Sequence, residues 1–333
     1  MNIVQTLWNG SDIYLFKLVN DSGAYVELSN YGATIVSIVV PDRNDNLISV
    51  ALGFPSFEGY GQDESYIGST IGRFANRIGG GSFVLNGKRF SLDRNDGQNS
   101  NHSGKAGFHA KVFSFQTGTD TITFWLSSSD GEGGFPGNVQ FEVKYSWNNE
   151  NELSIVYTAT TDQTTVMNFT NHAYFNLEGE GNILDHNLTV FADTMLEADS
   201  SYIPTGTIRK ADVASGVEKS IQERIKINGG SGLNSYYLFN TQRNNHEMVC
   251  QLKNETSGIQ LRVFTSLPGV QLYSGDYLMS KHAGHNGKPY KSLQGLCLEC
   301  QFPPDSPNHA NFLSTVVDAG SEFNHYILYK FDV

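Results

Sequence analysis

Residues 168–177 combine a strand-like pattern with a group that can transfer protons. One face of the expected strand carries hydrogen-bonding side chains: Asn168, Thr170, His172, Tyr174 and Asn176. The other face is mostly apolar and would pack in a core. An imidazole within a row of hydrogen-bonding groups suits a cleft that binds carbohydrate, with His172 able to give or take a proton. An ordinary strand facing solvent explains the alternation equally well.

Residues 296–302 repeat this arrangement around a carboxylate. Glu299 shares a face with Cys297 and Gln301, and the opposite face is apolar. Burial on so hydrophobic a strand would raise the pKa of Glu299 toward a value useful to a general base, and pairing with a nearby arginine is the structural alternative. Cys297 and Cys300 are three residues apart, so a strand directs their thiols to opposite faces. The sequence therefore predicts neither a redox pair nor a zinc site there.

The elements expected around these segments are strands. Alternation in residues 141–147 and 153–159 predicts a hairpin, and residues 82–85 and 88–92 flank the turn pair Asn86-Gly87. Helical patterns are confined to residues 55–62 and 220–227, each two turns at most. The 34 glycines and the 12% aromatic content also suit many short strands. We expect an all-β fold, a large antiparallel β-sandwich with few short helices, in which residues 1–333 form one domain.

Charge and hydropathy narrow the class of ligand. Lys and Arg total 22 against 34 Asp and Glu, a net charge of −12, and no local basic patch is present. This balance disfavours nucleic acid, anionic membranes and strongly anionic substrates, and it favours a neutral small molecule. No signal peptide is visible, the longest apolar run (residues 35–40) is far too short to span a bilayer, and three cysteines indicate a reducing compartment. We expect a cytoplasmic protein.

A series of motifs along the chain resembles the aldose 1-epimerase, or galactose mutarotase, family. The motifs are GRFANRI (72–78), NHAYFNL (171–177), PGVQLYSG (268–275) and LECQFPPDSPN (298–308), with weaker matches at 30–33, 130–138 and 203–206. They occur in the family's order and cover essentially the whole chain. The resemblance implies the galactose mutarotase-like supersandwich fold and interconversion of the α and β anomers of a free aldose such as galactose, glucose or a reducing disaccharide.

Roles in the site follow from the same resemblance. His172 matches the family's general acid, and Glu299 matches its general base. The remaining matches imply contacts with the sugar: His102, Arg73, Asn76 and Gln301. The GRFANRI segment resembles no phosphate loop, and its two arginines, four residues apart, could clamp a sugar or tie a bend together. The implied reaction uses no cofactor and no metal, and its partner is a small sugar bound by a monomer or homodimer.

Two departures from the family pattern leave alternatives open. Asn101-His102-Ser103-Gly104 stands where Leu-His-Gly-Gly is usual, and Asn234 stands near where the family commonly has a hydroxyl-binding aspartate. Asn234 is expected to take over that contact, with weaker hydrogen bonds. A related epimerase of hexose 6-phosphates and a sugar-binding module without turnover are the competing functions. The first would need a cationic pocket for phosphate, and the second would have no need of both an acid and a base.

Overall fold

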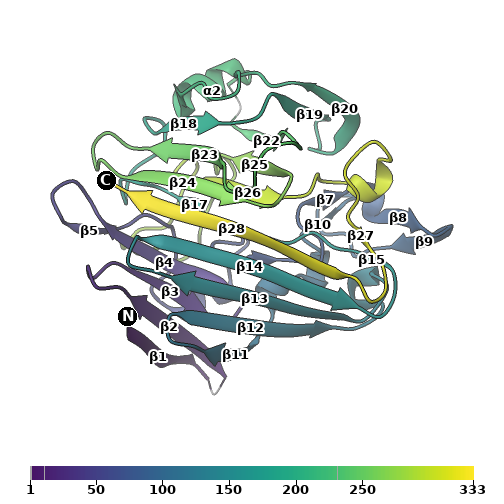
Figure 1. Ribbon diagram of the computed structural model, residues 1–333, viewed down its shortest axis with the longest axis horizontal. Helices are drawn as coiled ribbons and strands as arrows, with labels where there is room; N and C mark the ends of the chain where they lie inside the picture. Colours follow the sequence, from purple (N-terminus) through teal and green to yellow (C-terminus); the bar gives the residue numbers. More distant parts are fainter. Residues whose placement is uncertain (1, 11, 231) are drawn as a thin grey trace.

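The structure, a computed structural model, describes residues 2–10, 12–230 and 232–333. Three antiparallel sheets dominate it, with the longest strands running side by side across the middle of Figure 1. The first sheet contains, in order, β1 (Asn2–Asn9), β2 (Ile13–Val19), β3 (Tyr25–Ser29), β4 (Thr34–Pro41) and β5 (Leu47–Ser49).

The largest sheet has nine strands. Its order is β11 (Ser114–Thr117), β12 (Thr121–Ser128), β13 (Val139–Trp147), β14 (Glu152–Thr161), β28 (Glu322–Asp332), β24 (Gln260–Thr265), β23 (Met248–Lys253), β18 (Asn187–Val190) and β21 (Lys219–Ser220). The third sheet, which carries the candidate site, has the order β17 (Tyr174–Phe175), β26 (Leu296–Gln301), β25 (Gly269–Tyr273), β22 (Asn234–Leu238), β19 (Thr194–Ala198) and β20 (Pro204–Lys210).

Short elements complete the described part of the chain. Four two-stranded pairs are β6 (Thr70–Ile71) with β16 (Thr170–Asn171), β7 (Arg77–Ile78) with β10 (Ser100–Asn101), β8 (Ser82–Leu85) with β9 (Lys88–Ser91), and β15 (Thr165–Val166) with β27 (Val316–Val317). The helices are α1 (Phe57–Gly61) and α2 (Ile221–Ile227), with single 3₁₀ turns at 79–81, 104–106, 108–110, 132–134 and 306–308.

The predicted β-sandwich is confirmed, as are most of the elements expected from the sequence. Both hairpins form, as β13–β14 and β8–β9, and both helices fall within the two short segments expected. Strands β13 and β14 bury alternate residues, as their sequence pattern requires. Strand β26 differs, because all six of its residues are buried. Leu296, Leu298 and Cys300 belong to the main core, so the other face of β26 faces a second protected region.

The expected continuous strand over residues 168–177 is wrong. The segment forms β16 and β17, which pair with different partners, β6 and β26. Between them the side-chain carbonyl of Asn171 accepts the backbone N–H of Ala173 at 3.0 Å, a local turn that replaces ladder hydrogen bonds. His172 lies in this interruption. Its face is buried, which removes the interpretation of a solvent-facing strand.

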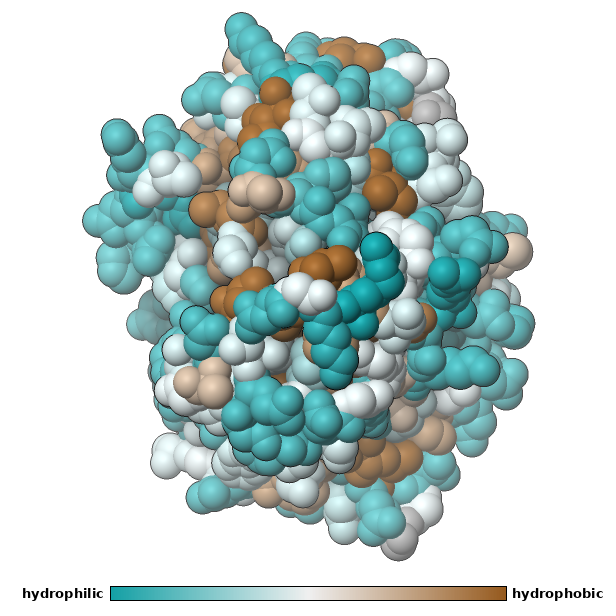
Figure 2. Space-filling view, turned by 90° about the vertical axis from the view of Figure 1, so that its right-hand side faces the viewer, coloured by the Kyte–Doolittle hydropathy of each residue, from teal (hydrophilic) through white to brown (hydrophobic). Residues whose placement is uncertain are grey.

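Surface properties agree with the composition. None of the helices in the described residues has the length and apolar character that crossing a bilayer requires. On the face in Figure 2, hydrophobic residues occur in small separate groups among hydrophilic ones. Such scattered groups are ordinary for a protein surface and do not form one broad apolar patch there.

Gly68 links β4 and β16 to His172 through its backbone N–H and carbonyl. Its N–H donates to the His172 carbonyl at 3.0 Å, and its own carbonyl accepts from the Ile35 N–H and from the Asn171 side chain. Its φ is +70°, and a β-carbon at this position would lie 2.0 Å from the Ile35 carbonyl oxygen. Only glycine satisfies both the left-handed backbone and the close approach of β4.

We expect Gly68→Ala to lower the free energy of unfolding by about 3 kcal/mol or more, since backbone strain and overpacking add. Gly87→Ala is the matched control: Gly87 also has a positive φ, +76°, in the β8–β9 turn, but an added β-carbon meets nothing within 4 Å. Strain alone predicts a loss of about 1 kcal/mol there. Urea unfolding of both variants measures the difference, and equal losses would contradict the crowding argument.

Candidate active site

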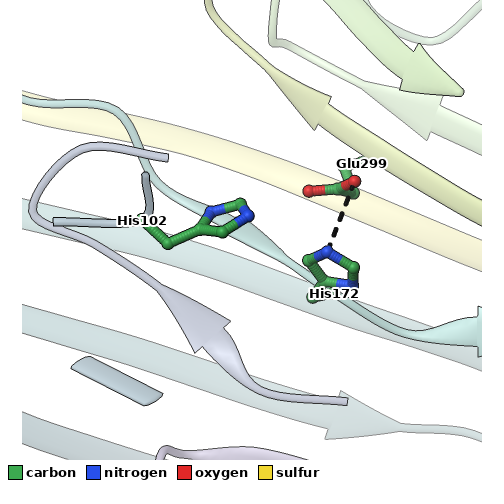
Figure 3. Close-up of side chains that lie close together, drawn as sticks. All are labelled: His102, His172 and Glu299. Atoms are coloured by element: carbon green, nitrogen blue, oxygen red, sulfur yellow. Dashed lines mark ion pairs between the residues drawn. The ribbon is translucent and has the colours of Figure 1, made fainter. Parts of the chain in front are cut away.

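A carboxyl group and an imidazole face each other in the protected region beside β26. Glu299 projects from the middle of β26, and His172 from the interruption between β16 and β17. The His172 Nε2 and Glu299 Oε1 atoms are 3.7 Å apart (Figure 3). Both residues are almost inaccessible to solvent, at 4% and 2% exposure, and the second carboxyl oxygen, Oε2, has no hydrogen-bond partner. A buried polar atom without a partner indicates a place prepared for a ligand group.

Burial shifts the pKa values of the two groups in opposite directions. Removal from water raises the pKa of Glu299 to about 8, with the positive charge of Arg77 opposing this shift. Burial also lowers the pKa of His172 to about 4, assisted by the nearby His109. Between these values the pair binds one proton, and that proton resides on Glu299. The pair thus contains one group that can donate a proton and one that can accept it.

His102 completes the cluster from the turn that follows β10. Its ring points toward the pair in Figure 3 and lies 5.4 Å from the His172 ring, centroid to centroid. The Asn76 backbone N–H donates to His102 Nδ1 at 3.1 Å, so the proton of the neutral ring is on Nε2. Burial holds the pKa of His102 well below its usual value. His102 therefore offers the site a neutral N–H donor.

The same tautomer argues against a metal centre. His102, His172 and Glu299 each have a candidate ligand atom within 4.8 Å of the others, the residue set of many metal sites. A cation would need the Nε2 lone pair of His102. Moving the proton to Nδ1 would set two N–H groups against each other at Asn76. The donor set therefore fits proton transfer better than metal ligation.

The three residues line a cavity of about 230 Å³. This volume is below the range of drug-sized pockets, about 300–1,000 Å³, and suits a single small ring. Its other walls are mostly aromatic and amide side chains, with one arginine, one serine and one glutamate: Tyr66, Tyr174, Tyr273, Tyr277, Asn76, Asn101, Asn234, Gln271, Arg77, Ser65 and Glu64. Ring faces and hydrogen-bonding groups of this kind match the alternating apolar and hydroxyl surfaces of a sugar.

A second cavity of about 280 Å³ adjoins the first. Asn76, Asn234 and Gln271 line both, so these three amides form the boundary between them. Gln271 donates from Nε2 to the Asn234 side-chain oxygen at 2.7 Å. This hydrogen bond leaves the Asn234 amide nitrogen for another partner.

Two residues expected to contact substrate lie elsewhere. The Arg73 guanidinium is buried and donates to the hydroxyl and carbonyl of Ser128 and to the carbonyls of Ser129 and Pro136. It ties chain segments together, so the prediction that Arg73 binds substrate is wrong. Gln301 is fully buried next to Phe302 and does not line the cavity, because it lies one repeat beyond Glu299 along β26. Asn76, Asn234 and His102 do line it.

Among the cavity residues that sequence reasoning missed, Arg77 and Gln271 are polar groups that can bind a ligand. Arg77 lines the cavity and pairs with Asp96, Nε to Oδ2, at 2.7 Å. Arg73 and Arg77 are four residues apart, and nothing in the sequence distinguishes the one that ties a bend from the one that faces the site. Gln271 pairs directly with Glu299 across β25 and β26. A polar residue between Val270 and Leu272 was the available signal for it.

A buried proton donor and acceptor in a polar, ring-sized cavity of an antiparallel β-sandwich define an acid–base enzyme site for a small polar ligand. The chain belongs to the aldose 1-epimerase family, whose profile matches residues 14–330. It is 37% identical to galactose mutarotase from Mus musculus, over 97% of this chain and 95% of that protein, and 32% identical to aldose 1-epimerase from Escherichia coli K12, over 97% and 96%.

Solved structures agree with this assignment. A Caenorhabditis elegans aldose epimerase homologue superposes with a TM-score of 0.89 at 28% identity, covering 96% of this chain and 98% of that one. Galactose 1-epimerase from Lactobacillus acidophilus superposes with a TM-score of 0.85 at 26% identity, covering 99% and 98%. The supersandwich fold that the motifs implied is therefore confirmed.

The two arginines of the 72–78 motif should respond differently to replacement. We expect Arg73→Met to lower the free energy of unfolding by about 3 kcal/mol or more, because three carbonyls and a hydroxyl lose their buried donor. Arg77→Met should cost less than about 1 kcal/mol, since its ion pair with Asp96 is partly exposed. Denaturant unfolding of both variants measures this. A larger loss for Arg77→Met would mean that the roles are reversed.

Proposed function

We propose that the Glu299–His172 pair catalyses interconversion of the α and β anomers of a free aldose. The observation that carries this proposal is the pair itself, a buried carboxyl group and an imidazole 3.7 Å apart in a sugar-sized cavity. Ring opening takes a proton from the C1 hydroxyl and gives one to the ring oxygen. Both oxygens are bonded to the same carbon, so two groups this close can serve both transfers. Membership of the aldose 1-epimerase family supports the isomerase class.

The proton count closes over one cycle. In the form needed for opening, Glu299 is ionised and His172 is protonated; Glu299 removes the C1 hydroxyl proton while His172 protonates the ring oxygen. This leaves Glu299 protonated and His172 neutral, the state that burial favours in the empty cavity. The aldehyde rotates about the C1–C2 bond, and reclosure reverses both transfers. No oxidation state changes and no group leaves, so acid and base catalysis is sufficient without a cofactor.

The remaining cavity residues supply binding. His102 donates from Nε2, Arg77 offers the guanidinium hydrogens that Asp96 does not occupy, and Gln271 and Asn234 offer amides. Asn76 lies on the cavity wall, in keeping with its place in the family motif, and so does Asn234, which stands near where the family commonly has a hydroxyl-binding aspartate. The adjoining cavity makes a reducing disaccharide a candidate substrate besides galactose and glucose.

Charge in the site favours a neutral sugar over a hexose 6-phosphate. Arg77 is the arginine of the catalytic cavity wall, and the Asp96 carboxylate already neutralises it. A phosphate would need uncommitted cations. A binding module without turnover is less well supported, because binding alone would not require a donor and an acceptor with opposed pKa shifts.

We also propose a cytoplasmic location, in keeping with three buried cysteines that are all unpaired.

Polarimetry tests the activity. Freshly dissolved α-D-galactose, α-D-glucose and maltose should approach their unchanged equilibrium rotations faster with the wild-type protein. Glu299→Gln and His172→Asn should each lower kcat by roughly 10²- to 10⁴-fold, the usual contribution of a positioned acid or base. Circular dichroism of each variant controls for folding. A folded wild-type protein that accelerates none of these sugars would refute the proposal, and hexose 6-phosphates would be assayed next.

The rate should depend on pH in a way set by the shared proton. Below about 4 both groups are protonated and no acceptor remains; above about 8 both are deprotonated and no donor remains. We expect kcat/KM, corrected for spontaneous mutarotation, to be level between these values and to fall about tenfold per pH unit outside them. Stopped-flow polarimetry over pH 3.5–9.5 measures the profile. A rate that keeps rising above pH 9 would show that no donor is needed.

A further inference from the structure

The face of His172 opposite Glu299 contacts a thiol. The His172 Nδ1 atom lies 3.5 Å from Cys297 Sγ, within reach of a sulfur hydrogen bond. Two aromatic rings lie next to the imidazole, Tyr174 at 5.1 Å and Tyr66 at 5.8 Å between centroids. Cys297 is therefore the polar partner of Nδ1 among the contacts that the structure describes, as Glu299 is of Nε2.

Cys297 has no part in the chemistry proposed above. It is completely buried, it does not line the catalytic cavity, and it lies two residues before Glu299 on the same face of β26. Across the strand pair it is directly opposite Tyr174. A core position on this strand could be filled by valine or alanine, so packing alone does not account for a thiol in contact with the imidazole.

The carboxyl group on the other side of the ring indicates which nitrogen carries the proton. Glu299, the member of the pair that holds the shared proton, faces His172 Nε2 at 3.7 Å, so the Nε2 lone pair of the neutral imidazole is directed at the carboxyl group. The proton of the neutral ring is then on Nδ1, where the sulfur of Cys297 is the acceptor at 3.5 Å. Tyr174, the cross-strand neighbour of Cys297, donates its own hydroxyl proton to the Ser65 carbonyl at 3.0 Å.

We propose that Cys297 is a positioning residue for His172, fixing the orientation and tautomer of the imidazole so that Nε2 exchanges protons with Glu299 and the sugar. The inference rests on the proposed function. A carboxylate at this place, as in many acid–base sites, would stabilise the imidazolium strongly. A thiol is a weak and neutral partner that can accept from Nδ1–H in both protonation states. That suits an imidazole that must donate in ring opening and accept in ring closure.

The kinetic test compares two cysteines of one strand. Cys297→Ala removes the partner, and we expect kcat to fall roughly tenfold with KM within twofold of wild type, the effect of losing one modest hydrogen bond in the transition state. Cys297→Ser keeps a group that donates and accepts, and it should recover kcat to within about threefold. Cys300→Ala is the matched control, because Cys300 is equally buried on β26 but belongs to the core on the opposite side. It should lower the melting temperature without changing kcat.

Nitrogen NMR reads the tautomer directly and without turnover. In protein with ¹⁵N-labelled histidine at pH 7, the His172 signals, assigned by their loss in His172→Asn, should show a protonated Nδ1 and a bare Nε2. In Cys297→Ala the two nitrogens should move toward an average of both tautomers. A wild-type ring protonated on Nε2 would overturn the proposal, as would wild-type kcat and an unchanged tautomer in Cys297→Ala. If the wild-type protein had no mutarotase activity, the NMR result would still decide the contact independently of the proposed function.

Discussion

Removal of one carboxyl group from water is the constraint on which the site depends. Glu299 lies on a strand whose residues are all buried, and its pKa rises to about 8 because the charged form loses hydration that the cavity does not replace. His172, held opposite, loses its charge for the same reason. The Coulomb attraction that would favour a fully charged pair is outweighed by the double desolvation. Two groups of very different intrinsic acidity thereby come to share one proton.

The surrounding structure serves to hold this pair against each other. Strand β26 is packed on the core through Leu298 on one side, which leaves Glu299 pointing into the cavity. The partner histidine lies between two short strands, β16 and β17, and not within one. The Asn171 turn breaks the ladder, and Gly68 fastens the break to β4. Arg73 performs a similar task further out, because its guanidinium donates to the carbonyls of Ser128, Ser129 and Pro136 and so ties the end of β12 to the segment that follows it.

The sequence was informative where a local pattern is sufficient. Alternation placed Glu299 on a buried strand and sent Cys297 and Cys300 to opposite faces, both of which the structure bears out. It failed where direction depends on tertiary contacts. The spacing does not distinguish Arg73 from Arg77. Only contacts with the distant segment at 128–136 show that Arg73 is the one whose guanidinium is bound within the protein. Gln301 shares the face of Glu299 on β26, but it does not line the cavity. The alternation along β26 cannot show where the cavity ends, because other segments form its walls.

The neutral residue at position 234 is consistent with the same electrostatic constraint. A carboxylate there, as the family commonly has, would add a negative charge to the wall of the cavity that holds Glu299, besides Glu64, which pairs with Lys281, and like charges raise the pKa of a neighbouring acid further. With Asn234 the described cavity wall has Arg77 as the charge that acts on Glu299, and that charge favours ionisation. The amide gives up strength in its hydrogen bonds to hydroxyl groups. The ionised form of Glu299, which the proposed ring opening requires, then stays closer in free energy to the protonated form of the empty site.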